Sequence, residues 1–107
     1  MDPADRIARF RAFVEKDPQN PLHNFALASA LATSGDAEAA EAAFARCLEI
    51  DPQWMVASIQ RGRALIALGR WDDARAALER GAELAQQQSH EEPFEEIREL
   101  MEQIPQG

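Results

Sequence analysis

The chain has 107 residues, enough for one domain, and its formal net charge of −8 disfavours binding to a nucleic-acid backbone. It contains neither a run of about 20 apolar residues, which a membrane span needs, nor an N-terminal signal segment, so we expect a cytoplasmic protein without a membrane partner. Alanine-rich composition with 7% aromatic residues favours helix over strand.

The first predicted helix lies within residues 1–18. Asp2 can cap it, and the proline that follows suits the first turn of a helix. The helix should end at Asp17, since a residue before proline is pushed out of helical geometry. Between these ends, one apolar stripe follows the helical period at Ile7, Phe10, Phe13 and Val14.

Two further helices are predicted within residues 21–52. Asn20 before Pro21 repeats the start signal, and Gly35 suits the left-handed conformation that closes a helix before Asp36 caps the next one. Apolar residues lie on two sides of the first of these helices, as expected for a helix between two neighbours, at Leu22, Phe25, Leu27, Ala28 and Leu31. The second helix should bury small side chains, together with Phe44 and Leu48, at Ala40, Ala43 and Cys47.

The same plan recurs in residues 55–86, with Gly69 at the turn. A polar break follows, and residues 92–104 then have the period of an amphipathic helix, with apolar positions at Phe94, Ile97, Leu100, Met101 and Ile104. Because the end of a stacked array exposes an apolar face, we interpret this last helix as a cap.

A duplication at an offset of 34 residues relates these elements, since Asp17-Pro18 recurs as Asp51-Pro52 and Gly35 as Gly69. Self-similarity at this period is typical of stacked helical hairpins. Residues 21–52 resemble a tetratricopeptide repeat, at Leu27, Ala28, Leu31, Gly35, Asp36, Ala40, Phe44, Leu48 and Asp51-Pro52. The second copy matches at Gly62, Leu65, Gly69, Trp71, Ala74, Leu78 and Leu84. It departs from the family at Arg61, Gly81 and Gln86.

The resemblance implies an all-α solenoid of antiparallel helix hairpins that forms a single domain over residues 1–107. Two full repeats, residues 21–52 and 55–86, would be flanked by an N-terminal half-repeat helix in residues 1–18 and a capping helix in residues 92–104. It also implies a small, stand-alone, bacterial-type protein that acts as a non-enzymatic scaffold for protein binding.

In this family the first helices of the repeats line a concave groove that usually receives a peptide, a helix or an extended tail. Carried over by position, the groove residues would be Leu22, Phe25, Ser29, Val56, Ile59 and Arg63. One branch of the family grips chaperone carboxylates with a lysine and asparagine clamp. The corresponding positions here hold Phe25, Ala26, Ser29, Val56 and Gln60, so the sequence does not support that clamp.

Two alternatives remain open for the groove. Phe25 and Ile59 would form an apolar strip for a partner peptide or amphipathic helix, or the flanking helices would already cover them. Arg63 would bind a carboxylate or phosphate of the partner, or it would pair with an acid of this chain. A different functional alternative is a structural homodimer whose exposed stacking face self-associates.

The sequence indicates no catalytic, cofactor or metal site. It has no glycine-rich phosphate loop and no nucleophile beside a base, and His23 and His90 belong to no metal-ligand spacing. We therefore expect no enzyme activity, no cofactor and no nucleic-acid partner.

Tryptophans and arginines are predicted to join the hairpins. Trp54 and Trp71 would act as wedges between helices. The central arginines would face the glutamates of the tail and orient the cap through exposed ion pairs, worth about 0 to 1 kcal/mol each, at Arg61, Arg70, Arg75 and Arg80.

Overall fold

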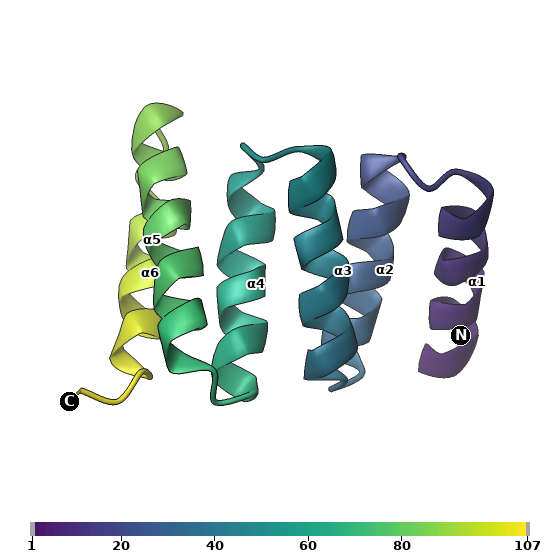
Figure 1. Ribbon diagram of the computed structural model, residues 1–107, viewed down its shortest axis with the longest axis horizontal. Helices are drawn as coiled ribbons and strands as arrows, with labels where there is room; N and C mark the ends of the chain where they lie inside the picture. The colour runs from purple at the N-terminus through teal and green to yellow at the C-terminus, as the bar shows by residue number, and fades with distance from the viewer. Residues whose placement is uncertain (1, 107) are drawn as a thin grey trace.

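A computed structural model describes residues 2–106 and contains six α-helices and no strand within that range. The helices are α1 (Pro3–Lys16), α2 (Pro21–Thr33), α3 (Ala37–Ile50), α4 (Met55–Ala67), α5 (Trp71–Gln87) and α6 (Pro93–Glu102). They stand side by side in a row along the longest of the Cα extents, 40 × 27 × 21 Å (Figure 1). The predicted all-α solenoid of antiparallel hairpins is confirmed. None of the described helices has the length and hydropathy needed to cross a membrane.

Local sequence signals set the ends of the first helices. The carboxylate or amide oxygens of Asp2, Asn20 and Asp36 accept hydrogen bonds from backbone amides two or three residues later, at 3.3, 3.1 and 3.1 Å. Gly35 and Gly69 have φ angles of +88° and +71°, the left-handed conformation that closes a helix. The capping and turn residues therefore work as the sequence predicts.

The last hairpin departs from the repeat. Helix α5 has 17 residues where α3 has 14, and it ends near Ser89, whose φ is 59°. The extra length carries α5 beyond its neighbours before the chain returns into α6 (Figure 1). The capping helix is shorter than residues 92–104, although Ile104 beyond its end is buried.

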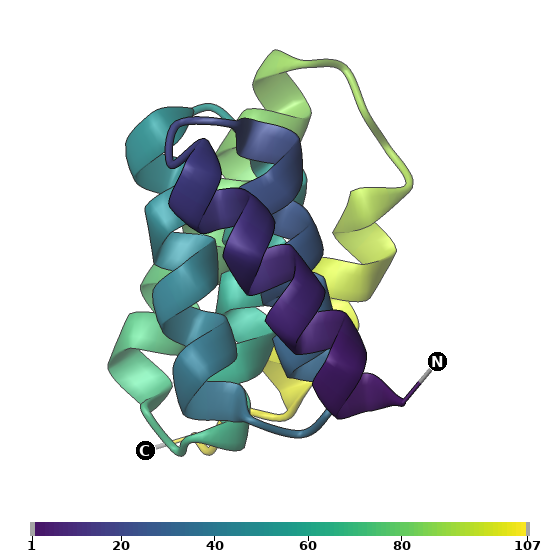
Figure 2. The same ribbon diagram turned by 90° about the vertical axis from the view of Figure 1, so that its right-hand side faces the viewer.

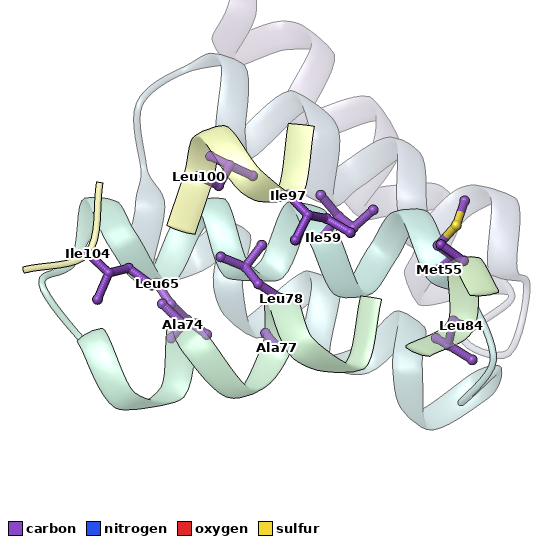
Figure 3. Close-up of a cluster of buried hydrophobic side chains, with 11 residues drawn as sticks. Met55, Ile59, Leu65, Ala74, Ala77, Leu78, Leu84, Ile97, Leu100 and Ile104 are labelled. Atoms are coloured by element: carbon purple, nitrogen blue, oxygen red, sulfur yellow. The ribbon is translucent and has the colours of Figure 1, made fainter. Parts of the chain in front are cut away.

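Two apolar clusters hold the row together. One is centred on α2 and α3 and includes Phe44 and Cys47. The other joins α4, α5 and α6, and Figure 3 shows Ile97 of α6 beside Ile59 of α4, with Leu100 farther along α6. The core is thus distributed along the row.

Trp54 acts as the predicted wedge, because it stacks on Phe25 with 5.0 Å between ring centroids, and Phe25 meets Phe44 edge-on at 5.7 Å. The prediction for Trp71 is wrong. Trp71 is the first residue of α5, just after the turn, and its side chain is exposed.

The ion pairs of the central arginines also differ from the prediction. Glu41 pairs with Arg61 at 2.9 Å and with Arg70 at 3.9 Å. The remaining pairs lie within one helical turn: Arg70 with Asp73 at 2.8 Å, Arg75 with Asp72 at 3.3 Å and Arg80 with Glu83 at 2.8 Å. These arginines do not reach the tail because acids lie closer on their own or adjacent helices. The tail is contacted instead by Arg63, whose Nη2 lies 3.1 Å from Oε2 of Glu96.

Candidate functional site

The candidate site is the surface formed by the outward side chains of α2 and α4, which we call the α2–α4 surface. Leu22 and Val56 lie 34 residues apart in the first turns of these two helices, and they are 74% and 41% exposed. No charged side chain is present in α2. Large apolar side chains exposed at matching positions of successive hairpins are the kind of surface that a partner covers.

Phe25 forms a fixed part of the wall beside this surface. It is half-buried, and its ring is held between Trp54 and Phe44. Because aromatic rings contact Phe25 on two sides, its side chain has little freedom to change rotamer when a ligand binds. It can offer only its uncovered edge.

Ile59 does not lie on the exposed surface, although the sequence placed it in the apolar strip. It is 2% exposed and belongs to the cluster that includes Ile97 and Leu100 (Figure 3). The sequence left open whether Ile59 is exposed in the groove or covered by a flanking helix. In the structure it is covered. The physical reason is that Ile59 packs against α5, where a Cβ atom on Gly81 would lie 2.8 Å from Cγ1 of Ile59, and belongs to the same cluster as the apolar stripe of α6.

Arg63 lies at the edge of a small hollow between α2 and α4. The hollow has a volume of about 180 Å³ and is lined by two polar side chains and six small residues, namely Gln60, Arg63, Ala32, Gly35, Ala37, Ala40, Ala64 and Ala67. Arg63 and Glu96 are both about half exposed, so their ion pair contributes only about 0 to 1 kcal/mol. A carboxylate of a bound partner can therefore replace Glu96 at little cost.

Ser29 faces a different hollow, between α1 and α2. This hollow has a volume of about 260 Å³ and is lined by Arg6, Phe10, Ala26, Ser29, Ala30 and Thr33. No sequence motif marks Arg6 or Phe10 as a site residue. The sequence does contain a related signal, because small residues recur on one face of α2 at spacings of three and four, at Ala26, Ser29, Ala30 and Thr33. Such a face allows close contact with a neighbouring helix, and the neighbouring helix in the chain is the one that carries Arg6 and Phe10.

Cys47 and His23 are both packed against neighbouring side chains. Cys47 is buried, and this burial raises the pKa of its thiol to about 11, so the thiol is protonated and unreactive at neutral pH. His23 is stacked on Phe13, with ring centroids 5.2 Å apart, and its Nδ1 has no hydrogen-bond partner. Residues 2–106 contain no group of three or more side chains placed to hold a metal ion.

Comparison with known families gives two matches, both to models described as tetratricopeptide repeat. One covers residues 2–53 and the other residues 31–92. None of the curated proteins matches this sequence.

Solved structures with similar folds include two from yeast Sti1. Its TPR2B domain in a complex with pHsp70 has a TM-score of 0.87 and 20% identity, over 96% of this chain and 82% of that chain. Its TPR2AB domain in a complex with pHSP90 has a TM-score of 0.88 and 21% identity, over 98% of this chain but only 41% of that chain. The first TPR of Spaghetti (RPAP3), bound to the HSP90 peptide SRMEEVD, has a TM-score of 0.77 and 25% identity, over 90% of this chain and 75% of that chain.

Proposed function

Because the chain belongs to the tetratricopeptide-repeat family, we propose that it is a non-enzymatic scaffold that binds a segment of another protein on the α2–α4 surface. The observation that carries this proposal is the matched exposure of Leu22 and Val56 on successive hairpins. The peptide complexes formed by proteins of the same fold give it further support.

The chemistry of the surface favours an apolar anchor over a carboxylate anchor. The positions that correspond to a carboxylate clamp hold no cation, as they are Phe25, Ala26, Ser29, Val56 and Gln60. We therefore propose a peptide or amphipathic helix whose apolar side chains cover Leu22 and Val56, with Arg63 available to an acidic group beside them. The edge of Phe25 would extend the apolar contact, while the covered Ile59 would act only as support.

A displayed random-peptide library selected against the immobilised chain tests the proposal. We expect selected peptides to carry apolar anchors and to bind the Leu22→Asp variant roughly tenfold or more weakly, since covering a leucine contributes about 1.5 to 3 kcal/mol. Val56→Asp should act in the same direction. The matched control is Trp71→Asp, which changes an exposed apolar residue on α5 and should leave affinity unchanged.

Two results of this selection would count against the proposal. If Leu22→Asp and Val56→Asp both bind the selected peptides as tightly as the parent chain, the α2–α4 surface is not the binding site. If the peptide SRMEEVD binds as well as the selected peptides, the preference for an apolar anchor is wrong. Circular dichroism of each variant separates loss of binding from loss of folding.

Self-association through a stacking face is the second candidate function. It is favoured by α1, which has no buried residue and leaves Phe13 40% exposed at one end of the row. At the other end, Ile97 and Leu100 are already covered. The exposed stacking face among the described residues is therefore the one on α1.

A further inference from the structure

The hollow between α1 and α2 has the shape of a helix acceptor. Five of its six lining residues have counterparts, 34 positions later, that line the hollow between α2 and α4: Ala40, Gln60, Arg63, Ala64 and Ala67. The rest of that second hollow is lined by Ala32 of α2, Gly35 of the turn and Ala37, the first residue of α3. The pair α3 and α4 is therefore equivalent to the pair α1 and α2. The end of α2 lies against the first pair, whereas no described helix lies at the equivalent place on the second.

The charge of this acceptor is positive. Helix α1 has four basic and two acidic side chains, and Arg6 lines the hollow where the inner repeat has Ala40. Within residues 2–106, no ion pair involves Arg6, Arg9 or Arg11. An occupant with acidic side chains is therefore favoured.

The opposite end of the row supplies such an occupant. Residues 91–102 contain six glutamates and one arginine, and α6 leaves Phe94 40% exposed among them. Figure 1 shows α1 and α6 at opposite ends of the row, and Figure 2 shows α1 nearest the viewer when the row is seen from its α1 end. Because α6 cannot reach α1 of its own chain, the contact requires two molecules.

We infer that α6 of a second copy of this chain docks in the α1–α2 acceptor, so that copies join head to tail. In this contact α6 keeps its place on its own α5 and adds α1 of the next copy on its other side. Helix α6 of one copy and α1 of the next copy then pack together as the two helices of a hairpin do within one chain. The inference rests on the second proposed function and specifies which faces associate.

Charge decides between this arrangement and a symmetric dimer. Pairing two α1–α2 faces would bring Arg6, Arg9 and Arg11 of one copy against the same residues of the other, and like charges disfavour that approach. Pairing the basic end with the acidic end brings opposite charges together. Because α1 and α6 lie at opposite ends of the row, two joined copies keep one free acceptor and one free α6, so the assembly grows with concentration until the rotation between copies closes a ring.

Sedimentation equilibrium of the full chain tests the growth. The contact involves few helices, so we expect weak association with a dissociation constant of about 0.1 to 1 mM. The weight-average mass should rise above the 11.9 kDa of one chain as the concentration approaches about 1 mM, and the rise should diminish at about 0.5 M salt. A chain that stays monomeric at about 1 mM in low salt overturns the inference.

Two single-end variants test the geometry. Arg6→Glu blocks the acceptor and leaves α6 intact, whereas Phe94→Asp blocks α6 and leaves the acceptor intact. Each variant alone should be monomeric, and their equimolar mixture should form a dimer that does not grow. The control Arg75→Glu makes the same charge change as Arg6→Glu on an exposed part of α5 and should associate like the parent chain.

Each other outcome contradicts the inference. Association of Phe94→Asp alone would mean that two α1–α2 faces pair, and association of Arg6→Glu alone would mean that two α6 helices pair. A mixture that stays monomeric would exclude the head-to-tail contact. Leu22→Asp should leave self-association unchanged, so this result is independent of peptide binding on the α2–α4 surface.

Discussion

The close packing of α4 against α5 depends on Gly62, and Gly62→Ala tests it. A Cβ atom at this position would lie 2.7 Å from Cδ2 and 2.8 Å from Cγ of Leu78. This is at least 0.6 Å inside the 3.4 Å at which ordinary contacts begin. Leu78 is fully buried, so its side chain cannot turn into solvent to relieve the overlap.

Two opposing effects set the magnitude for Gly62→Ala. Replacing glycine by alanine inside a helix stabilises the helix by about 1 kcal/mol. Forcing an extra methyl group into a packed core costs about 1 to 3 kcal/mol. Because Leu78 lacks room to move, we expect the overlap to dominate and the free energy of unfolding to fall by about 1 kcal/mol.

Urea unfolding followed by circular dichroism measures this change, with two matched variants. Ala76→Gly, at an exposed position inside α5, reports the alanine-to-glycine difference in this protein without any packing contact. Leu78→Ala removes both atoms that meet the new methyl group, at a cost of about 2 to 5 kcal/mol. In the Leu78→Ala background, Gly62→Ala should raise the free energy of unfolding by about as much as Ala76→Gly lowers it in the parent chain.

The reasoning is refuted if Gly62→Ala stabilises the otherwise unchanged chain by about 1 kcal/mol, because helix propensity alone would then account for the result. It is also refuted if the effect of Gly62→Ala is the same with and without the Leu78 side chain. That additivity would mean that the two residues do not interact.

Three further predictions follow from other parts of the fold. Gly35→Ala should lower stability by about 1 to 2 kcal/mol in urea unfolding and Gly35→Asn by less, because the position has a φ of +88° and no atom within 4 Å of a new Cβ; equal losses would contradict a backbone cause. Since burial raises the pKa of the Cys47 thiol from 9.0 to about 11, the folded state holds this proton more tightly, and stability should be complete below pH 9 and decline as the pH rises toward 11. Cys47→Ala should remove that decline, and an identical decline in the variant would exclude Cys47 as its source. Glu96→Gln should change the free energy of unfolding by no more than about 1 kcal/mol, because the pair with Arg63 is exposed. At high ionic strength the parent and the variant should unfold with the same free energy, since salt screens the pair. A larger loss would show that the pair with Arg63 anchors α6.

The helix ends were predictable because their signals are local. Asp2 and Asn20 cap the helices that they precede, and Gly35 and Gly69 adopt the left-handed conformation at the turns. Each of these residues acts on backbone groups within about four positions in the chain. A sequence pattern contains all the information that such contacts need.

The end of α5, at Gln87, lies one residue beyond the predicted range of residues 55–86, but the signal there is weaker than an Asp-Pro pair. The first repeat ends at an Asp-Pro pair, whereas α5 continues to Gln87 and stops near Ser89, a residue with no strong stop signal. The course of the chain from there depends on where α6 finds an apolar face. That face is formed by α5 together with α4, and the residues of α4 are distant in sequence.

Ile59 and Arg63 show why the candidate site was predicted only in outline. The helical period places both on the side of α4 that faces the groove in related proteins, but it contains no information about what α6 covers. In the structure, Ile59 is buried in the cluster that includes residues of α6, and Glu96 of α6 pairs with Arg63. Leu22 and Val56 stay exposed because no described helix covers the side of the first turns of α2 and α4 on which they lie.

Amide chemical-shift mapping with a selected peptide is the most direct test of whether a partner segment binds on the α2–α4 surface. We expect the shifted amides to lie in α2 and α4, around Leu22 and Val56, while the amides of α3 and α5 that face away stay near their free positions. Shifts confined to α3 and α5 would contradict binding at this surface.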